Sequence, residues 1–394
     1  MVEGLHRVVV TGLGAVTPIG NTVASYWEGL STGRNGVAGI TLFDPSAHAC
    51  RFAAEVKDFD PGRALPVPLR PRGANADPLT AVFSPKDLKK FGRFTHLGAV
   101  AAVEAYADSG LDAQRATMAG ERMGVNLGVG LGGLPEMEAM HTTWQAGGFR
   151  KISPFFIIQI APNLLAGQVS LLLDFRGSNM SVASACATSG HALGEAAATI
   201  ARGDADVMIS GGAESTITPL AVGAFAQMRA LSTRNDAPDK ASRPYDNDRD
   251  GFVLSEGSVV FVLEELEHAR RRGARIYAEA DMHFDGLVEL RRRSLLQQRR
   301  RFGGCVQLHG IDELCGLDVA LSVLGHVRFL LSAARRPPPC PRGCGAVDDG
   351  ATNVCERVLG DDLDAHGARR AFDHLAGGLD ARCIEVGHLL LRDL

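Results

Sequence analysis

The chain has 394 residues, of which 45% are hydrophobic and 22% charged, and its formal net charge is −4. This length and composition suffice for one large core or two medium ones, which excludes intrinsic disorder and a disulfide-stabilised miniprotein. With 41 basic and 45 acidic residues, we expect neither nucleic acid nor a membrane as a partner. Residues 1–7 lack a signal-peptide pattern and no apolar run reaches the roughly 18 residues of a membrane span, so we expect a cytoplasmic protein.

Strands and helices are predicted to alternate along the first 280 residues. The β-branched run 7–11 predicts a buried strand closed by Gly12 and Gly14, and Asn21 or Thr22 can cap the helix that follows. The segment 61–85 holds six of the 18 prolines and is expected to be a loop or an insertion outside the core.

The rest of this region continues the pattern. The further predicted elements are, in chain order, a helix over 91–111, strands over 123–129 and 181–184, a helix over 191–202, strands over 207–210 and 259–263, a helix over 264–272 and a strand from 275. Such alternation predicts an α/β fold in which sheets are buried under helices.

The composition changes abruptly near residue 280. Residues 281–394 contain no Lys, Tyr or Trp but 15 Arg and six of the eight Cys, and residues 335–339 (R-R-P-P-P) suit neither a helix nor a central strand. We favour a shift of the coding frame or gene model after Glu279 over an unusual C-terminal domain. We divide the chain into 1–255 and 256–394, regular to about residue 280 and divergent after it.

One cysteine has the setting of a nucleophile. Cys186 lies between an apolar strand and a helix of small residues, with Ala185 and Ala187 leaving room for a substrate. A helix start stabilises a thiolate through its free N–H groups and dipole, and the same groups can hold an oxyanion. An inert buried cysteine is the alternative. His191, five residues on at about 100° per residue, points away from Cys186, so a base must come from elsewhere.

The other patterns in the sequence are weaker. Residues 12–17 (G-L-G-A-V-T) match half of a dinucleotide fingerprint, but Thr17 replaces the third glycine. Glu214 and the charged run 246–250 are expected to serve turns and salt bridges. An irregular zinc-type cluster can be drawn from Cys340, Cys344, Cys355 and one of His366, His374 or Cys383. We favour neither site and expect no cofactor and no metal.

Several long motifs resemble the beta-ketoacyl-acyl-carrier-protein synthases, most nearly those of type II. They are V-V-V-T-G-L-G-A-V-T-P-I-G at 8–20, K-I-S-P-F-F-I at 151–157, S-V-A-S-A-C-A-T-S-G-H at 181–191, D-A-D-V-M-I-S-G-G-A-E-S at 204–215, R-A-L-S-T-R-N-D at 229–236 and S-R-P-Y-D-N-D-R-D-G-F-V at 242–253. The resemblance covers roughly 1–280 apart from 64–85. It implies a thiolase-like layered α-β-α-β-α fold, with the N-terminal half intact and the C-terminal half atypical, in a homodimer.

The resemblance also implies an activity. Cys186 matches the cysteine that takes an acyl group from acyl carrier protein, and malonyl-carrier protein then loses CO2 and condenses with it during fatty-acid elongation. Leu131 matches a gate of the acyl pocket and Phe225 a pocket wall. The partners implied are acyl carrier protein loaded with acyl and malonyl groups and a second copy of the chain.

The sequence departs from this family after residue 280. The histidine motifs N-A-H-G-T-S and K-S-x-x-G-H and the G-F-G-G-T-N loop are absent, and residues 307–310 and 385–390 are partial echoes only. Three functions therefore stay open: a condensing acyltransferase, an impaired remnant that only binds acyl groups or a partner, and a thiolase-like enzyme of coenzyme A thioesters. We expect 281–394 to be irregular coil with isolated helices that brings no imidazole within about 3 Å of the Cys186 sulfur.

Overall fold

The computed structural model describes residues 5–72, 77–282 and 288–291, all within the first of the two units, 1–324 and 325–394, into which the chain divides. The zinc-type cluster and nearly all of 281–394 lie outside the described residues. Within that segment, Val288–Arg291 forms a strand, so the expectation of irregular coil is wrong there. The proposed boundary at residue 255 stays a prediction. None of the described helices is both long and apolar enough to cross a bilayer.

The described residues are built on a mixed sheet of seven strands in the order β11-β10-β1-β9-β8-β6-β7. The strands are β1 (Val8–Val16), β6 (Met123–Gly128), β7 (Asn179–Met180), β8 (Val207–Glu214), β9 (Gly257–Glu265), β10 (Ala278–Met282) and β11 (Val288–Arg291). β6 runs parallel to β7 and β8, and the other neighbours pair antiparallel. The carboxyl ends of β6 and β8 therefore meet at one edge of the sheet.

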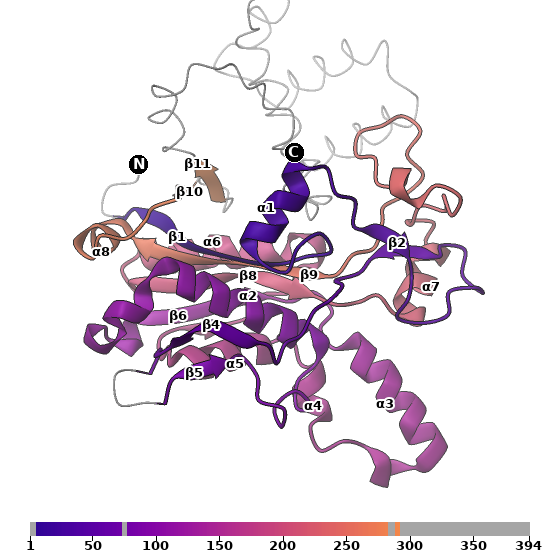
Figure 1. Cartoon of the computed structure of the whole chain (residues 1–394), viewed down its shortest axis with the longest axis horizontal. Helices are drawn as coiled ribbons and strands as arrows, with labels where there is room; N and C mark the ends of the chain where they lie inside the picture. The colour runs from indigo at the N-terminus through magenta and orange to yellow at the C-terminus, as the bar shows by residue number, and fades with distance from the viewer. Residues whose placement is uncertain (1–4, 73–76, 283–287, 292–394) are drawn as a thin grey trace, which may run out of the picture. The chain divides into compact units, whose positions relative to one another are not determined.

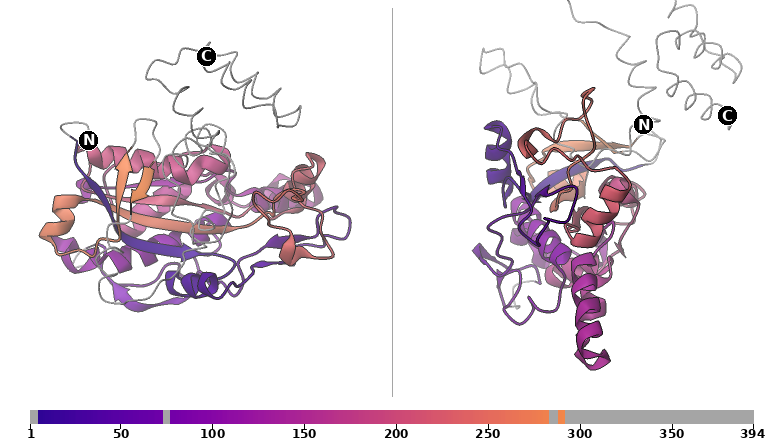
Figure 2. Two further views of the ribbon diagram at one scale, coloured as in Figure 1. Left: turned by 90° about the horizontal axis from the view of Figure 1, so that it is seen from above. Right: turned by 90° about the vertical axis from the view of Figure 1, so that its right-hand side faces the viewer.

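Helices cover both faces of this sheet, which confirms the predicted α/β class. The helices are α1 (Val23–Ser31), α2 (Arg93–Ser109), α3 (Leu134–Gly147), α4 (Phe156–Ile160), α5 (Leu164–Leu173), α6 (Thr188–Ala201), α7 (Pro219–Gln227) and α8 (Leu266–Arg271). One core cluster joins α2 and α5 to the sheet, and a second joins α6 to its other face. Figure 2 shows the strands between these helical layers when seen from above, and in Figure 1 α2 lies in front of the sheet.

Two glycines let β1 approach α2 closely. A Cβ built on Gly14 would lie 1.9 Å from the Ala101 carbonyl oxygen, and one on Gly12 would lie 2.2 Å from that of Ala105. These glycines do not close the strand, as the sequence had suggested, because β1 continues through them to Val16. They lie within a paired strand and are needed for its close packing against α2. This packing role explains the two glycines of the G-L-G-A-V-T motif without nucleotide binding.

The Pro-rich segment is only partly a loop. β4 (Ala64–Leu69) and β5 (Leu79–Ala81) pair as an antiparallel two-stranded sheet, and a second such sheet joins β2 (Val37–Gly39) to β3 (Phe52–Ala54). Leu69, Val82 and Phe83 are buried in the cluster that contains α2 and α5. The prediction that 61–85 lies outside the core is therefore wrong for these three side chains. The many prolines of this segment led to the prediction of a loop, although apolar residues between them are buried.

The other predicted helices and strands are confirmed with shifted ends. Thr22 caps α1, and its hydroxyl accepts a hydrogen bond from the Ser25 N–H at 3.2 Å. α2 ends before Gly110, whose φ of 70° is the left-handed conformation that glycine favours. The strand expected at 181–184 is shorter and earlier, at Asn179–Met180, which lies at the sheet edge.

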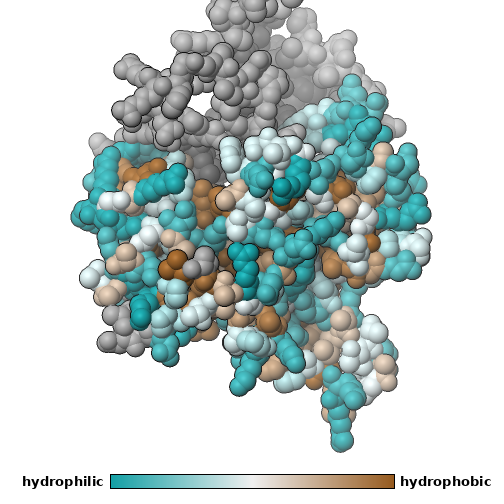
Figure 3. Space-filling model, in the orientation of Figure 1, coloured by the Kyte–Doolittle hydropathy of each residue, from teal (hydrophilic) through white to brown (hydrophobic). Residues whose placement is uncertain are grey.

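α3 is the least buried of the described long helices. None of its residues is buried, and Met137 and Trp144 are among its exposed apolar side chains. Figures 1 and 2 show that it extends away from the sheet. The face drawn in Figure 3 mixes apolar and polar side chains over the described residues.

His96 makes the stability of the fold depend on pH. Its ring packs edge-on against Phe83 at 4.9 Å between centroids, and burial lowers the pKa of His96 to about 4. Since the unfolded chain protonates this ring near pH 6.5, the stabilising contribution is present above that pH and is lost as pH falls towards 4. We expect a loss of about 2 kcal/mol between pH 7 and 5. Urea unfolding of the wild type and of His96→Leu measures it, and equal pH dependence in both proteins would contradict it.

Candidate active site

Small residues let the amino end of α6 rest on the carboxyl ends of β6 and β8. A Cβ on Gly128 would lie 2.8 Å from the Thr188 carbonyl oxygen, and one on Gly212 would lie 2.1 Å from the Ser189 hydroxyl oxygen. Glycine is therefore needed at both strand ends. This contact fixes the turn that precedes α6 at the edge of the sheet.

Cys186 lies in that turn, the 3₁₀ segment Ala185–Ala187, and is exposed. Ala185 has a φ of 50°, which costs a residue with a Cβ roughly 1–2 kcal/mol, and such conformations cluster at functional sites. The turn places Cys186 directly before the 14-residue helix α6, at the positive end of its dipole. The predicted sequence of strand, turn and helix around Cys186 is present, and Cys186 is not buried in a core strand as the alternative required. Its role as a nucleophile stays a prediction.

His191 does not contact the nucleophile. Its Nδ1 lies 2.7 Å from the Ser184 hydroxyl oxygen, and the Ser184 N–H donates to the Thr188 hydroxyl at 2.7 Å. These bonds tie the residue before the turn to the first two turns of α6. Among the described residues, no imidazole is hydrogen-bonded to Cys186. The sequence analysis did not predict this pair, because it depends on the turn at Ala185 that carries Ser184 back towards α6.

Glu214 anchors the loop that carries Leu131. Its carboxylate accepts hydrogen bonds from the Leu131 N–H at 2.9 Å and the Gly132 N–H at 3.2 Å. Burial raises the pKa of Glu214, and backbone N–H groups oppose that rise. A Cβ on Gly130 would lie 2.7 Å from the Glu214 carboxylate and 3.8 Å from the Ala185 carbonyl oxygen. The loop therefore lies beside the cysteine turn, and the expected role of Glu214 in a turn is confirmed.

Replacing Glu214 by leucine should release this loop. Because Glu214→Leu removes the carboxylate that accepts hydrogen bonds from the Leu131 and Gly132 N–H groups, we expect the free energy of unfolding to fall by about 1–3 kcal/mol and limited proteolysis to cut near Leu131. Glu121→Leu is the control, since Glu121 is 64% exposed and pairs with Arg176 on the surface; it should change stability by less than about 0.5 kcal/mol. Equal effects of the two substitutions would contradict the anchoring role.

The two predicted pocket residues occupy different surroundings. Leu131 is 54% exposed on the loop beside the cysteine turn. Phe225, on α7, is half-buried and packs edge-on against Phe252 at 5.4 Å between centroids. The structure brings Leu131 to the neighbourhood of Cys186 and places Phe225 in a separate apolar cluster under α7. Their roles towards an acyl chain stay predictions.

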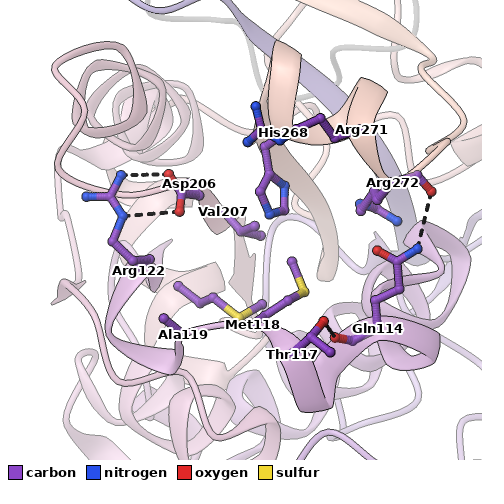
Figure 4. Close-up of a pocket in the computed structure, with 11 residues that line it drawn as sticks. Gln114, Thr117, Met118, Ala119, Arg122, Asp206, Val207, His268, Arg271 and Arg272 are labelled. Carbon is purple, nitrogen blue, oxygen red and sulfur yellow. Dashed lines mark hydrogen bonds and ion pairs between the residues drawn. The ribbon is translucent and has the colours of Figure 1, made fainter.

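A cavity of about 300 Å³ lies at the opposite end of the parallel strands. Its lining includes Met123 and Val207, the first residues of β6 and β8. Figure 4 shows Val207 among the side chains around this cavity. Arg122 and Asp206 pair across one side of it at 2.6 Å. This cavity is not part of the cysteine site. No group of three or more His, Cys, Asp or Glu side chains suited to a metal occurs in the part of the chain that the structure describes.

Comparison with known proteins identifies the family. The sequence model "Beta-ketoacyl synthase, N-terminal domain" matches residues 5–269. The chain is 46% identical to 3-oxoacyl-[acyl-carrier-protein] synthase 2 of Coxiella burnetii over 274 residues and 45% identical to that of Vibrio harveyi over 274 residues. Each alignment covers 70% of this chain and 61% of the relative, so the chain matches about three fifths of their length.

Solved structures agree with this match. A beta-ketoacyl synthase from Burkholderia phymatum STM815 is 32% identical with a TM-score of 0.59, and covers 70% of this chain and 63% of its own. A chain of a solved complex, described as a type II PKS acyl-carrier protein with its ketosynthase bound to the hexaketide, is 28% identical with a TM-score of 0.59, and the match covers 70% of this chain and 62% of that one. The thiolase-like fold predicted for the N-terminal half is confirmed. The chain belongs to the beta-ketoacyl synthase family.

Proposed function

We propose that this chain is a 3-oxoacyl-[acyl-carrier-protein] synthase of type II, which condenses acyl and malonyl thioesters in fatty-acid elongation through an acyl-enzyme on Cys186. The observation that carries the proposal is the exposed Cys186 in a strained turn at the amino end of α6. Relatives that bear this name are 40–46% identical over the same part of the chain. Acyl carrier protein with its acyl and malonyl groups is the proposed partner.

The first half-reaction suits the groups around Cys186. The thiolate attacks the carbonyl carbon of the acyl thioester, a carbon–sulfur bond forms to Cys186, and the thiolate of the carrier leaves. The positive end of the α6 dipole supports both the attacking thiolate and the developing oxyanion. Leu131 gates the acyl chain and Phe225 forms a pocket wall in this proposal. An apolar pocket discriminates chain lengths by about 0.8 kcal/mol per methylene.

The second half-reaction makes the new carbon–carbon bond. The malonyl group loses CO2, the electron pair of the broken bond attacks the acyl carbonyl carbon, and the Cys186 thiolate leaves. This step develops enolate charge that hydrogen-bond donors must stabilise. The histidine motifs that serve it in the family are absent from the sequence. That absence favours the second candidate, an impaired ketosynthase that accepts acyl groups or binds a partner without elongating them.

A two-stage assay on the full chain separates the two candidates. The protein is first incubated with hexanoyl-carrier protein, and intact-mass spectrometry measures the acyl adduct. Malonyl-carrier protein is then added, and the product is analysed for 3-oxooctanoyl-carrier protein. Adduct followed by product supports the condensing enzyme, and adduct without product supports the impaired one. Absence of an adduct would contradict the condensing enzyme and leave only a chain that binds a partner.

Assembly into a homodimer is part of the proposal. The edge strand β7 closely precedes Cys186, and its Met180 is 47% exposed, so an edge with an apolar side chain is open to pairing. We expect sedimentation at micromolar concentration to give a dimer, and a well-folded monomer would contradict this. The cytoplasmic location stays a prediction from the sequence.

A further inference from the structure

A second cavity, of about 380 Å³, lies between α3 and the segment that follows β8. Its apolar walls include Leu42 and Phe43 after β2, and Ile217 and Pro219 before and at the start of α7. Its volume is at the lower end of the range for small-molecule sites. The chemistry that the cavity favours is decided by the few polar groups among these walls.

Two residues that line this cavity each carry a buried side-chain oxygen without a hydrogen-bond partner among the described residues. The Ser215 hydroxyl, in a residue that is only 1% exposed, and Oε1 of Glu138 have no hydrogen-bond partner among the described residues. The other carboxylate oxygen of Glu138 faces the Leu220 N–H at 3.4 Å, a long contact. Buried polar atoms of native proteins are nearly always paired with protein, water or ligand. Ser215 and Glu138 therefore offer acceptors to an occupant of the cavity.

The charge around the cavity favours a cationic occupant. The guanidinium of Arg93, which also lines it, donates two hydrogen bonds to Glu256 at 2.7 and 2.6 Å, so these two charges cancel. The Glu138 carboxylate is left as the uncompensated charge of the lining. An ammonium group donates hydrogen bonds and accepts none, which complements acceptor atoms beside a carboxylate.

We propose that this cavity binds a small organic cation whose ammonium group meets the Glu138 carboxylate and the Ser215 hydroxyl and whose alkyl chain lies on the apolar walls. The site differs from that of Cys186, and its occupancy does not depend on acyl transfer. Ser215 follows Glu214, the anchor of the Leu131 loop, and α3 begins directly after that loop. A bound cation therefore lies beside Glu214, which anchors the Leu131 loop, and beside α3, which follows that loop.

The experiment compares three probes of equal chain length on the full chain. n-Hexylammonium, n-hexanol and hexanoate are titrated and followed by calorimetry or ligand-observed NMR. We expect saturable binding of n-hexylammonium, at least about tenfold tighter than that of n-hexanol, and no binding of hexanoate. Glu138→Gln should weaken n-hexylammonium binding by about tenfold, since it removes the charge and keeps the shape.

A pair of variants on the exposed surface of α3 tests the location without altering a buried polar group. Ala139 lines the cavity, so Ala139→Phe should fill it and abolish binding. Ala146, on the same helix, does not line it, so Ala146→Phe should bind n-hexylammonium as the wild type does. Equal affinity for n-hexylammonium and n-hexanol, no saturable binding, or full binding by folded Ala139→Phe would each overturn the proposal.

Discussion

Cys186→Ala should abolish acyl transfer while leaving the fold intact. The exposed thiol is the nucleophile of the proposed acyl-enzyme, so its removal should lower the rate at which hexanoyl-carrier protein loses its acyl group by at least about a thousandfold. The stability of the variant should change by less than about 0.5 kcal/mol, because exposed side chains contribute little. Thiol release from hexanoyl-carrier protein measures the first quantity and urea unfolding the second.

Cys50 supplies the matched control among the described cysteines. It is buried, its Sγ donates to the Phe52 carbonyl oxygen at 3.4 Å, and burial raises the pKa of its thiol. Cys50→Ala should therefore keep its rate of acyl transfer. Iodoacetamide should alkylate Cys186 before Cys50 in the folded wild type. A Cys186→Ala protein that still transfers acyl groups at the wild-type rate would refute the assignment.

Gly14→Ala should prevent stable folding. The new methyl group would lie 1.9 Å from the Ala101 carbonyl oxygen. The methyl carbon is fixed to the backbone of β1 and the oxygen belongs to the backbone of α2, so no side-chain rotation can relieve the clash. The strand and helix would have to separate, which disrupts the larger core cluster. We expect the free energy of unfolding to fall by more than about 3 kcal/mol, measured by urea unfolding and by soluble yield.

The control for this substitution is Gly167→Ala in α5. A Cβ on Gly167 meets nothing within 4 Å, and glycine inside a helix is unfavourable. The same chemical change should there raise stability by about 0.5–1 kcal/mol. Equal losses in the two variants would contradict the account of the contact between β1 and α2.

The sequence predicted the elements whose periodicity is regular, and it misjudged the ends of strands that contain glycine. β1 and β8 run past Gly12 and Gly211, because α2 packs closely on Gly12 and the backbone of β9 lies against Gly211, so both positions require glycine inside a strand. Glycine has a low intrinsic preference for strands, so a prediction from local sequence ends the strand at such a residue. The hairpin of β4 and β5 was missed for a related reason, since tertiary burial of Phe83 overrides the turn signal of the nearby prolines.

The candidate site was predictable only where its signal is local. Cys186 stands out because small residues and a helix start surround it in the sequence. The anchoring of the Leu131 loop by Glu214 joins residues 83 positions apart, and only the packing of β6 beside β8 brings them together. The hydrogen bond of His191 to Ser184 is local, but it depends on the turn at Ala185, which no residue preference indicates.

Locating the acyl group after reaction with hexanoyl-carrier protein tests directly whether Cys186 is the nucleophile. The full chain is incubated with this donor, digested under conditions that preserve thioesters, and sequenced by mass spectrometry. We expect one hexanoyl group, on the peptide that contains Cys186, and none on Cys50. A hexanoyl group on any of the other seven cysteines with Cys186 unmodified would contradict it.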